Sequence, residues 1–106
     1  MRKIPLKNVP SQILKVVLAE QNCQLKIYYR FGSMYMDVIV NGSMIQAGAI
    51  CRNRTRIVQV ANDSFVGSLH FLDLLGDSDP NWEGFGDRFS LLYVEPNEDI
   101  PKGFDL

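Results

Sequence analysis

Hydrophobic and polar residues alternate over residues 23–31, a pattern typical of a β-strand with one buried face. The predicted core face carries Leu25, Ile27, Tyr29 and Phe31, and the opposite face carries Lys26, Tyr28 and Arg30. The two aromatic residues at the end of this segment share their face with aliphatic residues. We therefore expect Tyr29 and Phe31 to belong to the core.

The segments on either side predict a β-meander. Residues 12–19 mix β-branched residues with leucines, which favours a strand. A helix over residues 10–21 is the alternative, because the apolar positions of this segment also fit a helical stripe. After a turn at Phe31-Gly32-Ser33, residues 34–40 place Met34, Met36, Val38 and Val40 on one face. Asn41-Gly42 then predicts a type I′ hairpin turn before a return strand over residues 43–51, where Gly48 suggests a bulge.

The remainder of the chain predicts further short strands separated by loops. Residues 57–60 predict a short strand, residues 62–64 a turn, and residues 67–72 and 91–95 two more strands. The glycine-rich, acidic stretch 76–87 predicts a long loop. We expect a mainly β protein, a small antiparallel β-barrel or sandwich built on the meander, with at most one or two short helices.

Composition agrees with one folded domain. The chain has 106 residues, of which 46% are hydrophobic and 22% charged, so it is too apolar for a disordered protein and too short for two cores. We expect a single domain over residues 1–95 and a C-terminal tail over residues 96–106. The apolar runs are too short to span a membrane, and we expect no secretory leader. Cys23 and Cys51 lack metal-ligand spacing, and we expect free thiols in a reducing compartment, with no metal and no cofactor.

Charge divides the sequence into two parts. Residues 1–60 carry nine basic and two acidic residues, residues 61–106 carry two basic and ten acidic residues, and the net charge is −1. If the segment 52–56 is extended, Arg52, Arg54 and Arg56 point to one side and can donate to carboxylates of another chain. The alternative is that these three arginines only form a charged, solvent-exposed strand edge. The candidate protein-interface residues are Arg52, Arg54, Arg56, and Asp77, Asp79 and Trp82 of the acidic loop.

The sequence offers little support for catalysis. His70 is the single histidine, and no local motif pairs it with a nucleophile, so we expect a structural histidine and no enzyme. A small β-barrel binding module for single-stranded nucleic acid or a peptide is the alternative function, because aromatic residues such as Tyr28 and Tyr35 lie near Arg30. The sequence pI of 5.7 argues against nucleic acid as a partner.

The order of several short motifs resembles the bacteriophage baseplate plug family of contractile-tailed phages. The motifs, in chain order, are Ile4-Pro5-Leu6, Gln24-Leu25-Lys26-Ile27-Tyr28-Tyr29, Tyr35-Met36-Asp37-Val38, Ala47-Gly48, Gly67-Ser68-Leu69-His70-Phe71, Gly76-Asp77-Ser78-Asp79-Pro80, Phe85-Gly86 and Leu91-Leu92-Tyr93-Val94. Each motif is short, and their order along residues 4–94 carries the resemblance.

The resemblance implies a non-enzymatic structural protein of the virion. Such a plug lies in the tail baseplate, where the hub and spike meet the end of the tail tube, and helps to close the channel until infection. The expected partners are therefore the hub, the spike, the tail-tube end and further copies of the chain itself, with no membrane and no nucleic acid. Assembly in the cytoplasm of the host bacterium follows from the same resemblance.

Overall fold

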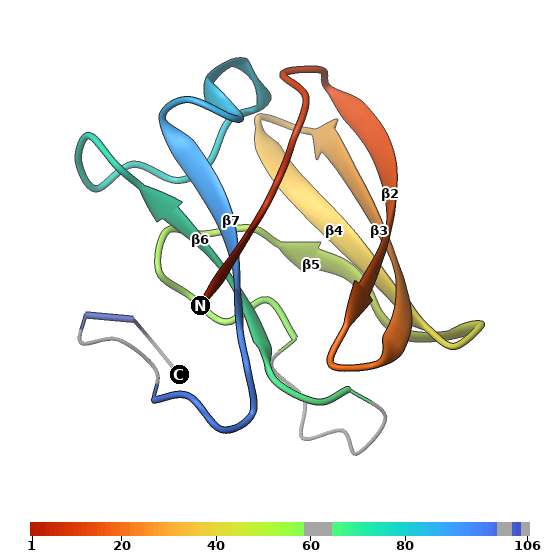
Figure 1. The fold of residues 1–106 in the computed structure, drawn as a ribbon. Coiled ribbons are helices and arrows are strands. Elements are labelled where there is room, and N and C mark those ends of the chain that lie inside the picture. The colour runs from red at the N-terminus through yellow and green to blue at the C-terminus, as the bar shows by residue number, and fades with distance from the viewer. Residues whose placement is uncertain (59–64, 100–102, 105–106) are drawn as a thin grey trace.

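The computed structural model describes residues 1–58, 65–99 and 103–104, and these residues form two antiparallel sheets. The elements are β1 (Arg2–Ile4), β2 (Ser11–Leu18), β3 (Gln21–Arg30), β4 (Ser33–Val40), β5 (Ser43–Ile50), β6 (Ser68–Asp73), a 3-10 helix η1 (Trp82–Gly84) and β7 (Phe89–Val94). One sheet has the order β2-β3-β4-β5 and the other the order β1-β7-β6 (Figure 1). No helix in the described part is long and apolar enough to cross a membrane.

The four-stranded sheet is the predicted β-meander. Its three hairpins turn through the pairs Ala19-Glu20, Phe31-Gly32 and Asn41-Gly42, and both residues of each pair have positive φ, as type I′ turns require. The Asn41-Gly42 prediction is therefore confirmed. The alternative helix over residues 10–21 is wrong, because β2 pairs with β3 along its whole length, from Ser11 opposite Tyr28 to Leu18 opposite Gln21.

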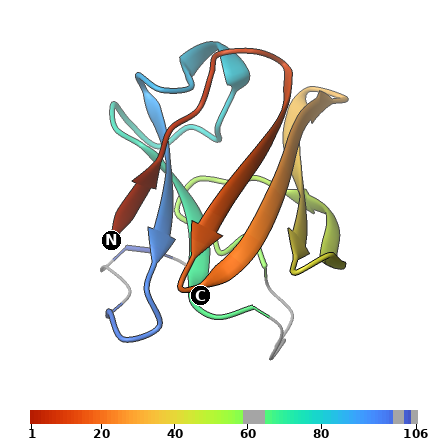
Figure 2. The ribbon, with the colours of Figure 1, turned by 45° about the vertical axis from the view of Figure 1, so that its right-hand side comes forward.

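The core lies between the two sheets. The predicted inner face of β4 is confirmed, since Met34, Met36, Val38 and Val40 are all buried. The three-stranded sheet supplies Leu69, Phe71, Leu91 and Tyr93 from the opposite side. Figure 2 shows the two sheets facing each other, with η1 at one end of the molecule. Because the sheets are not joined into a closed ring of paired strands, the architecture is the sandwich and not the barrel of the two that we expected.

Two predicted core residues are at the surface. Tyr29 is 47% exposed and Phe31 is 88% exposed, whereas Leu25 and Ile27 of the same strand are fully buried. The prediction was wrong at both positions. Tyr29 still pairs with Met34 but lies near the end of β3, where burial no longer alternates. Phe31 has a φ of 51° at the β3–β4 turn and leaves the strand. The Phe31 ring lies beside the Arg30 guanidinium, whose Cζ atom is 5.3 Å from the ring centre.

The second half of the chain follows the prediction in outline. The two strands expected at residues 67–72 and 91–95 are β6 and β7, which pair from Ser68 opposite Val94 to Asp73 opposite Phe89. The expected loop 76–87 contains η1. β1 had no counterpart in the sequence analysis and pairs with β7. Of the strand predicted at residues 57–60, residues 57 and 58 are described and belong to no strand, so this part of the prediction is wrong, and residues 59 and 60 lie outside the described residues. The predicted turn at 62–64 lies wholly outside them.

Candidate functional site

The acidic loop between β6 and β7 starts from a buried carboxylate. Asp73, at the end of β6, is buried and accepts hydrogen bonds from Nε and Nη2 of Arg88, each at 2.8 Å. It also accepts from the backbone N–H groups of Leu75 at 2.9 Å and Ser78 at 2.8 Å. These contacts, the Arg88 hydrogen bonds above all, hold the pKa of Asp73 well below its usual range. The carboxylate therefore ties both ends of the loop together.

The middle of the loop is fixed by its own side chains. Asn81 caps η1 by accepting a hydrogen bond from the Glu83 backbone N–H at 3.1 Å. Trp82 packs against the core while remaining partly exposed, and the Phe85 ring stacks on Phe71 with ring centres 5.6 Å apart. Leu74 and Leu75 at the start of the loop are exposed, whereas Trp82 and Phe85 pack inward. The loop also presents the exposed carboxylates of Asp77, Asp79, Glu83 and Asp87.

The structure brings one of the candidate arginines to this loop. Arg54 Nη2 lies 3.7 Å from Asp77 Oδ1, and the backbone N–H of Asn53 donates to Asp79 Oδ1 at 3.0 Å. The Asp77 side chain is 85% exposed, so this ion pair contributes less than about 1 kcal/mol to stability. Part of the charge asymmetry of the sequence is therefore neutralised within the chain, and most of the loop's carboxylates remain at the surface.

The three arginines do not form the expected row. Arg54 has a φ of 62°, which interrupts the extended backbone that a row requires. Arg52 is exposed, whereas Arg56 is partly buried and pairs its backbone with His70 in an isolated bridge. The geometric expectation was wrong because left-handed backbone at a non-glycine residue has no signal in the hydrophobic pattern.

His70 is buried on β6. Its ring is fully buried, lies 2.9 Å from the Ser68 hydroxyl through Nε2, and packs against Phe104 with ring centres 5.0 Å apart. Burial lowers the pKa of His70 to about 4, and the positive charge of Arg56 acts in the same direction. The imidazole is therefore neutral at physiological pH and has no open face toward a substrate.

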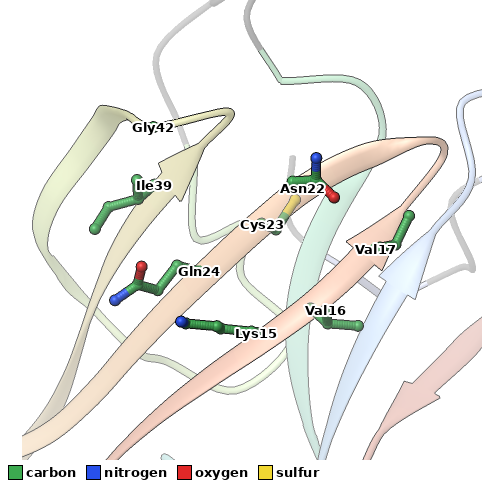
Figure 3. A pocket seen from close by; sticks show the side chains of 8 residues that line it. All are labelled: Lys15, Val16, Val17, Asn22, Cys23, Gln24, Ile39 and Gly42. Carbon is green, nitrogen blue, oxygen red and sulfur yellow. The ribbon is translucent and has the colours of Figure 1, made fainter.

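A shallow groove on the outer face of the four-stranded sheet was not predicted. It has a volume of about 400 Å³ and is lined by residues of β2, β3 and β4 together with the following turn, among them Lys15, Val17, Gln24 and Ile39. Figure 3 shows these side chains, with the Lys15 ammonium group directed toward Gln24. The alternation of the strands indicated which residues point outward, but their assembly into one groove depends on the register between strands.

The outward aromatic residues lie further along the same face. Tyr28 and Tyr35 stack with ring centres 6.0 Å apart, and the Tyr28 hydroxyl donates to Asp37 Oδ1 at 3.0 Å. This hydrogen bond helps raise the pKa of Tyr28, after the larger effect of burial. The two rings therefore stack on each other, and Tyr28 is held between the Asp37 carboxylate, to which it donates, and the Lys26 ammonium group, 5.9 Å from its ring centre.

A family model described as Cyanophage baseplate Pam3 plug gp18 matches residues 1–97 of the chain. None of the curated proteins matches the chain. The matched range includes all of the strands in Figure 1, the acidic loop and the groove. The resemblance inferred from the order of the short motifs is thereby confirmed.

Proposed function

The chain belongs to the cyanophage baseplate Pam3 plug gp18 family, and from this premise we propose that it helps to plug or connect the hub and spike region at the end of the tail tube. Membership makes the chain a component of a phage tail baseplate, associated with other baseplate proteins. The finer role, at the junction of hub, spike and tube end, is our proposal. We also propose that the chain acts by assembly and not by catalysis.

The family match is the observation that carries the proposal, and the geometry of the surface supports it. A plug must present fixed contact surfaces to its neighbours, and the acidic loop is fixed at its base by Asp73 and Arg88 and in its middle by Asn81 and Trp82. Preorganised loops lose little conformational freedom on binding, which favours stable assembly.

The placement of the chain can be tested by cross-linking intact virions. Purified virions of the phage that encodes the chain are treated with a lysine-reactive cross-linker and analysed by mass spectrometry. We expect cross-links from exposed lysines such as Lys7, Lys15 and Lys26 to the hub, the spike or the tail-tube end. Cross-links confined to proteins at the baseplate periphery would overturn the proposed position while leaving family membership intact.

The contribution of the arginine side of the molecule can be tested separately. In one variant Arg52, Arg54 and Arg56 are replaced together by serine, and in a matched control Lys3, Lys7 and Lys26 are replaced, which removes the same charge elsewhere. After circular dichroism has verified folding, incorporation into baseplates is measured at low and high salt. We expect the arginine variant to be incorporated less well than the control at low salt, because charge-assisted contacts are screened by salt. Equal incorporation of both variants would show that the three arginines are solvent-exposed and make no contact needed for assembly.

A further inference from the structure

Two adjacent leucines at the start of the acidic loop are held at the surface in a fixed conformation. Leu74 is 52% exposed and Leu75 is 77% exposed. The Leu74 N–H donates to the Arg88 carbonyl at 2.8 Å, and the Leu75 N–H donates to Asp73 Oδ1 at 2.9 Å. Because this backbone is already fixed, residues 74–77, which we call the leucine turn, can bind a partner with little loss of conformational freedom.

Carboxylates flank the two leucines. Asp77 ends the leucine turn, and its contact with Arg54 at 3.7 Å leaves the Asp77 side chain 85% exposed. Asp87 is exposed, directly precedes Arg88 in the chain and forms no ion pair within the described residues. A surface that binds the leucine turn therefore needs an apolar hollow with a positive charge beside it.

The groove on the outer face of the four-stranded sheet is such a surface. Its volume of about 400 Å³ lies within the range of pockets that hold small ligands, and Val17 and Ile39 are among its lining residues. Lys15, Gln24 and Ile39 lie in one row across β2, β3 and β4. Figure 3 shows the Lys15 side chain in this groove, with its ammonium group directed toward Gln24. The groove therefore combines apolar side chains with one positive charge.

Few carboxylates of the sheet compete for this charge. Asp37 is the one acidic residue on the four strands, and its Oδ1 already accepts hydrogen bonds from a tyrosine hydroxyl and a backbone N–H. Glu20 lies in the turn after β2, away from the residues that line the groove. No carboxylate in the described part of the chain forms an ion pair with Lys15, so its ammonium group can donate to a carboxylate of another molecule.

The leucine turn and the groove lie on opposite sides of the molecule. The turn follows β6 of the three-stranded sheet, whereas the groove lies on the outer face of the four-stranded sheet. Figure 1 shows the loop after β6 on the left, and β2 and β3 on the right. A copy therefore cannot place its own leucine turn in its own groove.

We propose that the leucine turn of one copy binds the groove of a second copy, head to tail. The two leucines contact Val17 and Ile39, and the Lys15 ammonium group faces Asp77 and Asp87. The occupant is a second copy because both halves of the contact are on this chain and match in apolar character and in opposite charge. Every head-to-tail contact leaves one turn and one groove free, so association continues into a ring or an open chain.

The test is the self-association of the purified chain, which is independent of the proposed position in the baseplate. Sedimentation equilibrium is measured from micromolar to millimolar concentration at low ionic strength. The variants Leu75→Ser and Lys15→Glu change the turn and the groove. Their matched controls are Phe31→Ser, at an 88% exposed residue of the β3–β4 turn, and Lys3→Glu, at an exposed residue of β1. Circular dichroism verifies that all four variants fold.

We expect the mass of the parent chain to rise beyond that of a dimer with concentration, because each added copy offers a free turn and a free groove. Leu75→Ser and Lys15→Glu are each expected to weaken association by at least about fivefold, and the two controls are expected to associate like the parent chain.

A mixture of the two impaired variants gives the sharpest readout. Leu75→Ser keeps an intact groove and Lys15→Glu keeps an intact leucine turn, so an equimolar mixture should form a one-to-one dimer and nothing larger. A parent chain that stays monomeric, or that stops at a dimer, would overturn the proposal. A mixture that associates no better than either variant alone, or controls that weaken association as much as the variants do, would also overturn it.

Discussion

Replacement of Gly67 by alanine tests the packing between the start of β6 and the core. Gly67 directly precedes β6 and has a φ of 89°, in the left-handed region. A Cβ atom at this position would lie 2.6 Å from Cζ of Tyr93 and 2.6 Å from the Val94 carbonyl oxygen, and it would also meet the Tyr93 hydroxyl. Tyr93 is fully buried and donates a hydrogen bond to the Val66 carbonyl, so it cannot move aside freely.

The expected cost has two parts. Left-handed backbone costs an alanine about 1–2 kcal/mol. Forcing an extra methyl group into a packed core costs about 1–3 kcal/mol. The sum lowers the free energy of unfolding of Gly67→Ala by about 2–5 kcal/mol, a large part of the ~5–15 kcal/mol that holds a domain folded. Gly32→Ala supplies the control, because Gly32 has a similar φ of 82° and nothing within 4 Å of the added Cβ.

The assay is urea-induced unfolding followed by the fluorescence of Trp82, the single tryptophan. We expect Gly32→Ala to lose about 1–2 kcal/mol, the backbone cost alone. Gly67→Ala is expected to lose about 1–3 kcal/mol more than that, the packing cost. If the two variants lose the same free energy of unfolding, the close approach of Gly67 to Tyr93 is not a feature of the folded protein, and the packing argument fails.

Three further predictions concern titration and thiol reactivity. Because the folded-state pKa of His70 is lowered to about 4, the unfolded chain binds more protons than the folded chain at mildly acidic pH. The free energy of unfolding should therefore fall as pH drops from about 6.5 to about 4. In urea titrations the variant His70→Met, which has no titratable group at this position, should show a flatter dependence on pH. The pKa of Asp73 is also lowered, chiefly by Arg88. The stability that this carboxylate contributes to the fold should therefore be complete above the unfolded-state pKa and decline only below about pH 4. A melting temperature that already falls near neutral pH in the parent chain, and not in Asp73→Asn, would contradict this. Burial raises the pKa of both Cys23 and Cys51, so a thiol reagent should label two groups in the denatured, non-reduced chain and label them far more slowly in the native one.

The meander could be predicted because its determinants are local. In β4 the alternation of four buried residues with outward residues fixes the face, and Asn41-Gly42 fixes the turn. The Ala19-Glu20 turn lacks glycine and gave no such signal. β1 is only three residues long and is defined by pairing with β7, from Arg2 opposite Tyr93 to Ile4 opposite Leu91, a contact that no local pattern encodes.

The candidate interface was predictable in composition and not in geometry. The acidic residues of the loop were apparent from the sequence, but the bond from Arg88 to Asp73 that fixes the loop joins positions 15 residues apart across a chain reversal. A signal did exist, because Arg88 is one of two basic residues in the second part of the chain. The arginines do not form the expected row, because Arg54 has a left-handed backbone conformation and its side chain contacts Asp77.

The central claim is that the chain closes or connects the baseplate at the end of the tail tube. Cryo-electron microscopy of intact virions of the phage that encodes the chain tests this most directly, since the sandwich of Figure 1 can be fitted to the map. We expect density for the two sheets and the acidic loop where the hub and spike meet the tube end, in contact with those proteins. Density for the sandwich at the baseplate periphery, or a tail that lacks it altogether, would contradict the account.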